Sequence, residues 1–174
     1  MNIQETNRRL YESGMKHSMC KKIADAWNEV MSEQELIDMW YDNYDFALVH
    51  HFPDNDEIKA CFSKEILRKN NVLVNDVWSI LNPKKAMILG SSTTNIRFNS
   101  FNVGQVWVRN TSKANVYVKD YADVTICVMD KANVNIINYS QNAKVLVIKY
   151  SKTAQVTAIG TNITNKENLT YLQH

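Results

Sequence analysis

A short phrase that recurs through residues 94–160 constrains the fold more than any other feature of the chain. Most copies have a small residue, one polar residue and then two β-branched residues separated by one variable residue, as in Ala-Asn-Val-Tyr-Val at 114–118. The small residues stand at 94, 104, 114, 122, 132, 143 and 154, in steps of 10, 10, 8, 10, 11 and 11. Alternation with period two inside each copy, with polar residues between copies, predicts short strands joined by tight corners.

This repeat predicts a β-solenoid built from units of about ten residues. Each strand has one apolar row, which it can bury only against the strands of neighbouring coils. A small residue at each corner would leave room for the coil above. The alternative is an antiparallel sheet of hairpins, but hairpin turns normally contain glycine. Only Gly90, Gly104 and Gly160 lie in this half of the chain.

Residues 1–71 lack the repeat and predict a small helical bundle. Residues 1–18 form either a short helix or a loosely held arm, because they are polar and only weakly periodic. The next helix is expected at about 19–31, where apolar residues recur with helical spacing.

Capping residues mark the later helices. Ser32 and Glu35 form a capping box that begins a helix running to about Val49. Asp54 and Ser63 are expected to cap two shorter helices that follow.

The predicted fold class is α+β, with a helical module at 1–71, a β-solenoid at 72–160 and a C-terminal tail at 161–174. An open solenoid end exposes unpaired backbone groups, so we expect the helical module to cap the first coil. The tail loses the repeat and is expected to form a loop with a short turn.

The two halves of the chain carry opposite charge. Residues 1–71 have 13 acidic and 9 basic side chains, a net −4, whereas residues 72–174 have 5 acidic and 11 basic, a net +6. A basic solenoid could attract an acidic partner or a nucleic acid, or its lysines could simply keep the surface soluble. Sequence-specific nucleic-acid binding is disfavoured, because Arg97 and Arg109 are the only arginines in this half.

The cysteines Cys20, Cys61 and Cys127 are too few and too scattered for a disulfide framework, which favours a reduced setting. The first ten residues are polar and no apolar run approaches the length of a membrane span. We therefore expect a cytoplasmic protein without a membrane partner.

The sequence gives weak support for chemistry. His17 and Cys20 could form a metal site only with the distant His50, His51 and Cys61, and this set lacks the paired close spacing of zinc ligands. Cys127 is a thiol on a strand of the repeat, with no base or orienting group evident. The stretch 90–94 lacks the lysine and the spacing of a P-loop. We therefore expect no enzyme activity, metal or cofactor.

Aromatic residues in the repeat half suggest a binding face. Several alternate with the buried row, or follow it, and are therefore expected on the outside, where they either stack as ladders between coils or contact a partner. The residues predicted to bind, together with neighbouring cations, are Trp107, Arg109, Tyr117, Lys119, Tyr139 and Lys149.

The phrases at 112–118 and 130–136, Ser-Lys-Ala-Asn-Val-Tyr-Val and Asp-Lys-Ala-Asn-Val-Asn-Ile, resemble the short repeats of bactofilin-like polymer-forming proteins and of adhesin-head-like β-solenoids. The arrangement of a helical module before such repeats looks like uncharacterised proteins of phages and mobile elements of gut anaerobes. These resemblances imply a solenoid and a setting, and they assign no catalytic or binding residue.

We therefore expect a non-enzymatic protein-interaction module, such as a phage or mobile-element protein that inhibits a host defence system. The solenoid would present a flat basic and aromatic face to a protein partner. Two alternatives are a structural component that assembles into homo-oligomers and non-specific nucleic-acid binding through the lysine-rich face.

Overall fold

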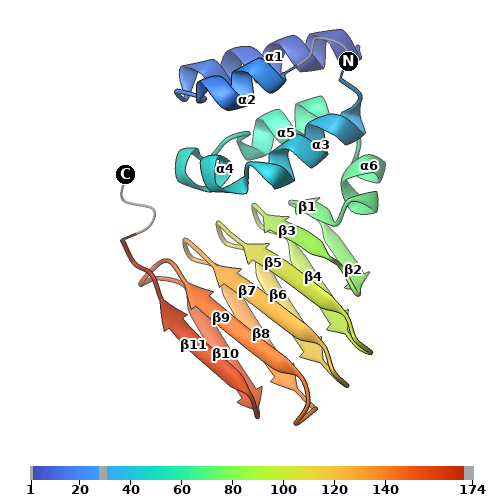
Figure 1. The fold of residues 1–174 in the computed structure, drawn as a ribbon, viewed down its shortest axis with the longest axis vertical. Helices are drawn as coiled ribbons and strands as arrows, with labels where there is room; N and C mark the ends of the chain where they lie inside the picture. The colour runs from blue at the N-terminus through green and yellow to red at the C-terminus, as the bar shows by residue number, and fades with distance from the viewer. Residues whose placement is uncertain (1, 28–30, 171–174) are drawn as a thin grey trace. The chain divides into compact units, whose positions relative to one another are not determined.

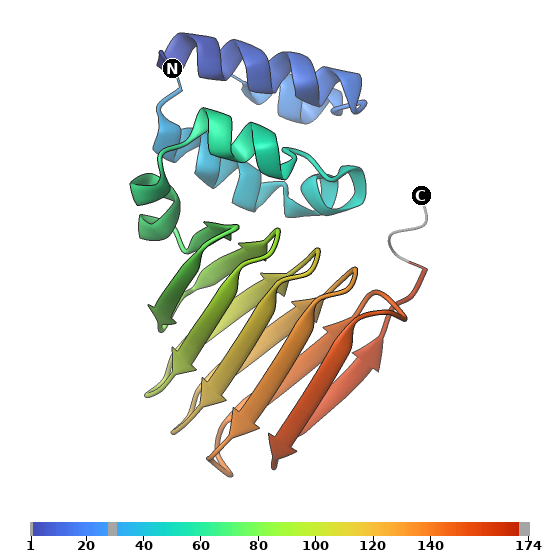
Figure 2. The ribbon, with the colours of Figure 1, turned by 180° about the vertical axis from the view of Figure 1, so that it is seen from behind.

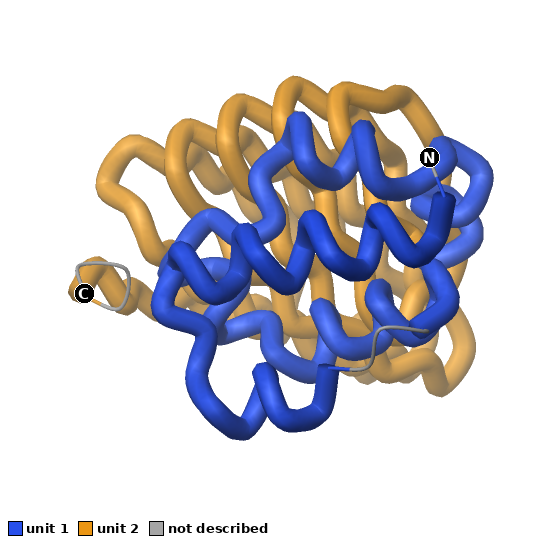
Figure 3. The backbone as a smooth tube through the Cα atoms, turned by 90° about the horizontal axis from the view of Figure 1, so that it is seen from above, with its two compact units in different colours: residues 1–70, 174 blue, residues 71–173 orange. Residues whose placement is uncertain are grey.

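The computed structural model describes residues 2–27 and 31–170. The chain divides after Asn70 into two compact units, which Figure 3 shows in different colours. The first unit is helical and the second is a β-solenoid (Figure 1). The prediction of N-terminal helices followed by a β-solenoid is confirmed, and the sheets of the solenoid are parallel.

The described part of the first unit contains six helices. Their bounds are α1 Ile3–Lys16, α2 Lys21–Ala26, α3 Glu33–Asp42, α4 Tyr44–His50, α5 Asn55–Cys61 and α6 Lys64–Lys69. Residues 3–16 are therefore helical, which decides between the two expectations for the N-terminal stretch. The helix expected at 19–31 ends at Ala26, and residues 28–30 of that expectation lie outside the described residues.

Local capping chemistry sets the starts of these helices. The Ser32 hydroxyl accepts from the Glu35 amide at 3.3 Å, and the Ser32 amide donates to Glu35 Oε2 at 2.7 Å, so the predicted capping box is confirmed. The predicted caps at Asp54 and Ser63 are also confirmed.

The prediction of a single helix that runs to about Val49 is wrong. It is interrupted at Asn43, which lies between α3 and α4 and leaves the helical region with φ −117°. The Asn43 side-chain amide donates to the Met39 carbonyl at 2.8 Å, and so satisfies an acceptor in the last turn of α3.

The described part of the second unit contains eleven strands. Their bounds are β1 Val72–Val74, β2 Val77–Leu81, β3 Lys85–Leu89, β4 Thr93–Phe98, β5 Val103–Val108, β6 Lys113–Val118, β7 Asp123–Val128, β8 Asn133–Asn138, β9 Lys144–Lys149, β10 Gln155–Gly160 and β11 Ile163–Glu167.

Successive strands alternate between a six-stranded sheet, β1-β3-β5-β7-β9-β11, and a five-stranded sheet, β2-β4-β6-β8-β10. The chain thus winds through about five coils (Figure 2). Every strand pair in both sheets is parallel, which excludes the hairpin alternative. The tail was expected to be a loop, but residues 163–167 form β11, which pairs with β9. The solenoid therefore continues beyond residue 160.

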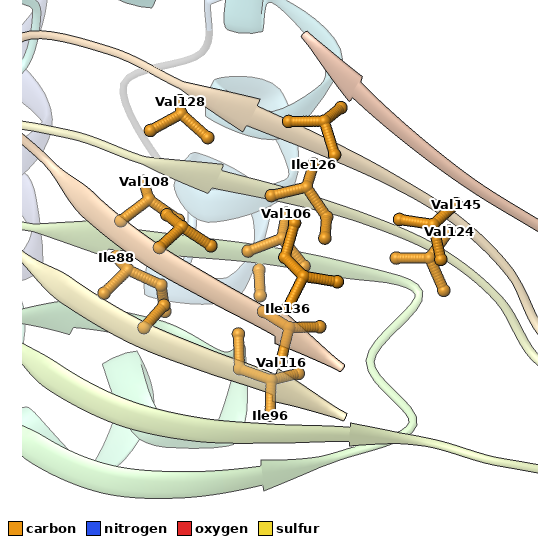
Figure 4. Packing of buried hydrophobic residues seen from close by; sticks show 14 of the residues in the cluster. Ile88, Ile96, Val106, Val108, Val116, Val124, Ile126, Val128, Ile136 and Val145 are labelled. Atoms are coloured by element: carbon orange, nitrogen blue, oxygen red, sulfur yellow. The ribbon is translucent and has the colours of Figure 1, made fainter. Parts of the chain in front are cut away.

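The core lies between the two sheets and consists of stacked rows of aliphatic residues. Ile96, Val116 and Ile136 occupy equivalent positions in β4, β6 and β8, and each is at most 1% exposed. Val106 and Ile126 form the facing row in the six-stranded sheet (Figure 4). Full burial of such a side chain contributes about 1.5–3 kcal/mol, so this repeated core drives folding of the solenoid.

Residues in the left-handed backbone region, all but one of them polar, make several of the corners. Gly90, Ser100, Asn110, Asp120 and Asp130 have φ values of 70°, 57°, 58°, 57° and 53°. Asn and Asp tolerate this conformation better than most side chains. Their side chains also join the coils, because Asn110 Oδ1 accepts from the Gly90 amide at 2.8 Å and Asp120 Oδ2 accepts from the Ser100 amide at 2.7 Å.

The expectation that the small residues of the repeat occupy the corners is wrong. Gly104 and Ala114 are the second residues of their strands, while Ala122, Ala132 and Ala143 directly precede strands. The three alanines are fully buried. They are small because the chain enters the core at these positions. The bends before Ala122 and Ala132 are made by Asp120 and Asp130, which have positive φ two positions earlier.

Candidate functional site

The outer surface of the five-stranded sheet presents side chains in rows that run across the coils. Strand register places them in three rows. The first row is Val77, Thr93, Lys113, Asn133 and Gln155; the second is Ser79, Asn95, Asn115, Asn135 and Thr157; the third is Leu81, Arg97, Tyr117, Ile137 and Ile159. We call these fifteen positions the five-stranded face. None of its strands, all of which are described, contains Asp or Glu.

The middle row contains a ladder of side-chain amides. Asn115 Nδ2 donates to Asn95 Oδ1 at 3.1 Å, and Asn135 Nδ2 donates to Asn115 Oδ1 at 3.1 Å. Such ladders hold successive strands in register and keep a sheet surface flat. Each amide has two N–H groups and two lone pairs, so the ladder retains hydrogen-bonding capacity toward a partner.

A hollow lies where the third row meets the corner after these strands. Residues two positions beyond the row also face outward, which brings Asn99, Lys119 and Tyr139 beside Arg97, Tyr117 and Ile137. The hollow has a volume of about 280 Å³. We call it the end pocket, and it is lined by Arg97, Phe98, Asn99, Tyr117, Lys119 and Tyr139.

Two interactions shape the end pocket. Lys119 Nζ lies 5.4 Å from the centroid of the Tyr139 ring, a cation–π contact that holds the ammonium beside the pocket. Phe98, which is only 1% exposed, belongs to the core and contributes a rigid apolar wall. The pocket therefore combines two cations with aromatic surface.

Exposed apolar residues continue around the corner from the end pocket. Phe101, Val103 and Tyr121 are 78%, 69% and 55% exposed, and we call them the corner ridge. The Phe101 and Tyr121 rings stack with centroids 4.9 Å apart and planes 10° apart. Exposed apolar residues gathered in one place, rather than scattered singly, are typical of interaction sites.

The structure brings together three of the six predicted binding residues. Tyr117, Lys119 and Tyr139 all line the end pocket. Tyr139 is 60% exposed and Lys119 is also exposed, so both are available to a partner.

Trp107 and Arg109 do not belong to this site, which corrects the prediction. Trp107 lies in β5 of the six-stranded sheet, and Arg109 directly follows that strand. Their exposed fractions are only 1% and 5%. Trp107 alternates with the core residues Val106 and Val108, but it is buried as well. Arg109 Nε lies 3.6 Å from Asp130 Oδ2, an arrangement that indicates a structural ion pair.

Lys149, which was also predicted to bind, does not belong to this site either. It is in register with Val128, a core residue, so its position faces the inside of the coil. Its ammonium lies 3.7 Å from Glu167 Oε1 on the neighbouring strand β11. Lys149 is therefore an internal partner of the last coil and not part of an aromatic face.

Arg97 and the corner ridge residues Phe101 and Val103 are not among the residues predicted from the sequence to bind. Arg97 is 20 residues before Tyr117 and pairs with it in register. Comparing positions 20 residues apart, one full coil, would have placed Arg97 beside the predicted tyrosine. Phe101, in the connection after β4, and Val103, the first residue of β5, carry no comparable sequence signal. An apolar residue in or next to a short strand is normally assigned to the core.

Within residues 2–27 and 31–170, no group of three or more His, Cys, Asp or Glu side chains could hold a metal ion. The thiols differ in accessibility, since Cys20 is exposed while Cys61 and Cys127 are buried. Burial raises the pKa of Cys127 to about 11, an effect only partly offset by hydrogen bonds with Gln105 and Tyr150. Burial also raises the pKa of Cys61. Both thiols therefore contain little thiolate at neutral pH.

We expect a thiol reagent such as DTNB to label only Cys20 rapidly in the folded protein at pH 8. The other two thiols are buried and protonated at that pH, and they should react only after unfolding in guanidinium. The Cys20→Ser variant should lose the rapid phase. Rapid labelling of Cys127 in that variant would show that this thiol is accessible and reactive.

Comparison of the chain with protein-family models, with curated proteins and with solved structures gave no match. None of the helices in the described part of the chain is long and apolar enough to cross a membrane.

Proposed function

We propose that this protein is a non-enzymatic protein-interaction module that binds a protein partner through the five-stranded face, the end pocket and the corner ridge. The observation that carries the proposal is the concentration of exposed apolar side chains there. Among the described residues, nine large hydrophobic side chains are clearly exposed, and seven of them belong to this region. They are Val77, Leu81, Phe101, Val103, Tyr121, Tyr139 and Ile159.

The chemistry of the region suits a protein partner. Protein interfaces are enriched in tyrosine, other aromatic residues and arginine, and are depleted of acidic residues at their centre. Tyr117, Tyr139 and Arg97 lie together at the end pocket, and the face has no carboxylate. The amide ladder adds hydrogen-bonding groups on a rigid surface, so little conformational entropy is lost on binding.

The setting we propose follows from the resemblance of the whole arrangement, a helical module before short repeats. The protein would belong to a phage or mobile element and act in the cytoplasm on a host protein, as an inhibitor of a defence system does. In this proposal the helical module at 1–71 caps the solenoid of ten-residue units, because an uncovered first coil would expose unpaired strand edges.

Affinity capture tests the proposed function. The full chain, the triple variant Tyr117→Ala/Lys119→Ala/Tyr139→Ala and the control Lys131→Ala/Lys152→Ala would each be used as bait in a nuclease-treated bacterial lysate. The control lysines are exposed and lie at the opposite corners. We expect one dominant protein to be retained by the wild type and the control, and reduced at least about tenfold by the triple variant.

Three other outcomes would contradict the proposal. Equal capture by the triple variant would show that the partner binds elsewhere. Capture that disappears with nuclease would indicate nucleic-acid binding, whose affinity should also fall steeply with added salt. Retention of further copies of the bait alone would indicate a self-assembling component.

A further inference from the structure

We propose that the end pocket is a carboxylate-binding site, which receives an Asp or Glu side chain from an extended acidic segment of the partner. This inference rests on the proposed function and specifies the chemistry of the partner. Arg97 and Lys119 supply two positive charges from adjacent coils, with Tyr117 between them as the register partner of Arg97. The site therefore has the groups that recognise an anion, on a surface already suited to contact a protein.

Neither cation is neutralised internally. Among the described residues, no carboxylate lies within ion-pair distance of Arg97 or Lys119, whereas Arg109 and Lys149 each have one. Asp120, which follows Lys119 in the chain, is at the corner and its Oδ2 accepts from the Ser100 amide at 2.7 Å. Two uncompensated cations beside one hollow favour binding of an anion and speed its approach.

The lining also suits the shape of an acidic side chain. A guanidinium binds a carboxylate through two parallel N–H···O bonds, and an ammonium held over an aromatic ring adds a second charge. The rings of Tyr117 and Tyr139 can pack against the methylene groups of Asp or Glu, and their hydroxyls are hydrogen-bond donors. A pocket of about 280 Å³ holds one side chain rather than a whole folded element.

The charge of the face argues against a second copy of this chain as the occupant. A two-fold contact through the five-stranded face would bring Arg97 and Lys113 of both copies together. The face has no acidic residue to compensate them. An acidic partner gains attraction from the same arrangement.

The third row extends the site beyond the carboxylate. Ile137 and Ile159 follow Tyr117 on the next two strands, and Ile159 is 62% exposed. Two strand spacings amount to about 10 Å, which an extended peptide spans in about three residues. We therefore expect an aliphatic residue about three positions from the acidic one in the partner segment.

Peptide display on the full-length protein tests this inference. A random 12-residue peptide library would be selected on the wild type and counter-selected on Arg97→Gln/Lys119→Gln, which keeps polar side chains and removes both charges. We expect enrichment of peptides with Asp or Glu near an aliphatic residue. Replacing that acid by its amide in the best peptide should weaken binding by about tenfold to the wild type and much less to the double variant.

Controls separate the possible outcomes. Lys131→Gln/Lys152→Gln should bind like the wild type, and matching circular dichroism spectra should show that every variant is folded. Peptides that need Tyr117 and Tyr139 but are indifferent to both cations would overturn the carboxylate site and leave the proposed interaction face intact. Failure to obtain any peptide that depends on the end pocket would count against both.

Discussion

The substitution Gly104→Val is expected to lower the free energy of unfolding by about 3 kcal/mol or more. A Cβ atom at this position would lie 2.4 Å from Phe98 Cε1 and 2.5 Å from the Pro83 carbonyl oxygen. Valine itself suits the row, because Val124 is the register partner of Gly104 in the next coil. A side chain at 104 is excluded by the Pro83 carbonyl and by the large Phe98 ring, which takes the place that Val118 has one coil later.

A double-mutant cycle isolates this exchange of sizes. Phe98→Val alone should cost about 2–3 kcal/mol through lost burial. In Phe98→Val/Gly104→Val the ring no longer opposes the new side chain, so the combined loss should be smaller than the sum by at least about 1 kcal/mol. Rescue should be incomplete, because the Pro83 carbonyl remains in place.

Urea unfolding of the full chain, followed by far-ultraviolet circular dichroism, would measure these changes. Val103→Ile is the matched control, since it enlarges a 69% exposed residue next to Gly104 and should change stability by less than about 0.5 kcal/mol. Strict additivity of the two core substitutions would show that Gly104 and Phe98 do not compete for the same space.

The solenoid could be predicted because its determinants are periodic. Alternation within each phrase assigns residues such as Val116 to the inside and Asn115 to the outside, and both assignments agree with the structure. Helix starts at Ser32 and Asp54 could be predicted for a different reason. An N-cap is a hydrogen bond between residues two or three positions apart, so a short stretch of sequence contains all the residues needed to recognise it.

The failures concern features that depend on more than local pattern. Trp107 alternates with Val106 and Val108 as an outward residue should, but alternation does not reveal whether an outer surface is open, and Trp107 is 1% exposed. The repeat is not recognisable in the sequence of the tail, because polar residues such as Asn165 occupy its inward positions. It nevertheless forms β11, since backbone pairing with β9 does not require an apolar side chain.

Only three of the six residues that line the end pocket could be predicted from the sequence. Tyr117, Lys119 and Tyr139 were found because each is itself an unusual residue on an outward position. Arg97 was missed because its importance comes from the coil above, where Tyr117 is its register partner. Sites on a solenoid are assembled across coils, so positions one coil apart must be compared before single residues are judged.

Asp130→Ala is expected to cost about 3 kcal/mol, whereas Asp120→Ala should cost only about 1 kcal/mol. Both are corner residues with positive φ, 53° and 57°, and each accepts a hydrogen bond from the backbone amide 20 residues earlier. Strain from alanine in this conformation is therefore common to both variants and cancels in the comparison. The difference measures the ion pair of Asp130 with Arg109, whose atoms Oδ2 and Nε are 3.6 Å apart, together with a weak second hydrogen bond that Asp130 Oδ2 accepts from Asn110 Nδ2 at 3.4 Å.

The pair is important because Arg109 is buried. Burial lowers the pKa of its guanidinium and Asp130 acts in the opposite direction, which means that the carboxylate offsets part of the cost of burying the charge. Asp130→Asn, which keeps an acceptor and tolerates positive φ, should still lose most of the stability if charge is the cause. Urea unfolding at low and high salt should preserve the gap between the two aspartates, because buried pairs are screened little. Equal losses for Asp130→Ala and Asp120→Ala would mean that both side chains act only as corner hydrogen-bond acceptors.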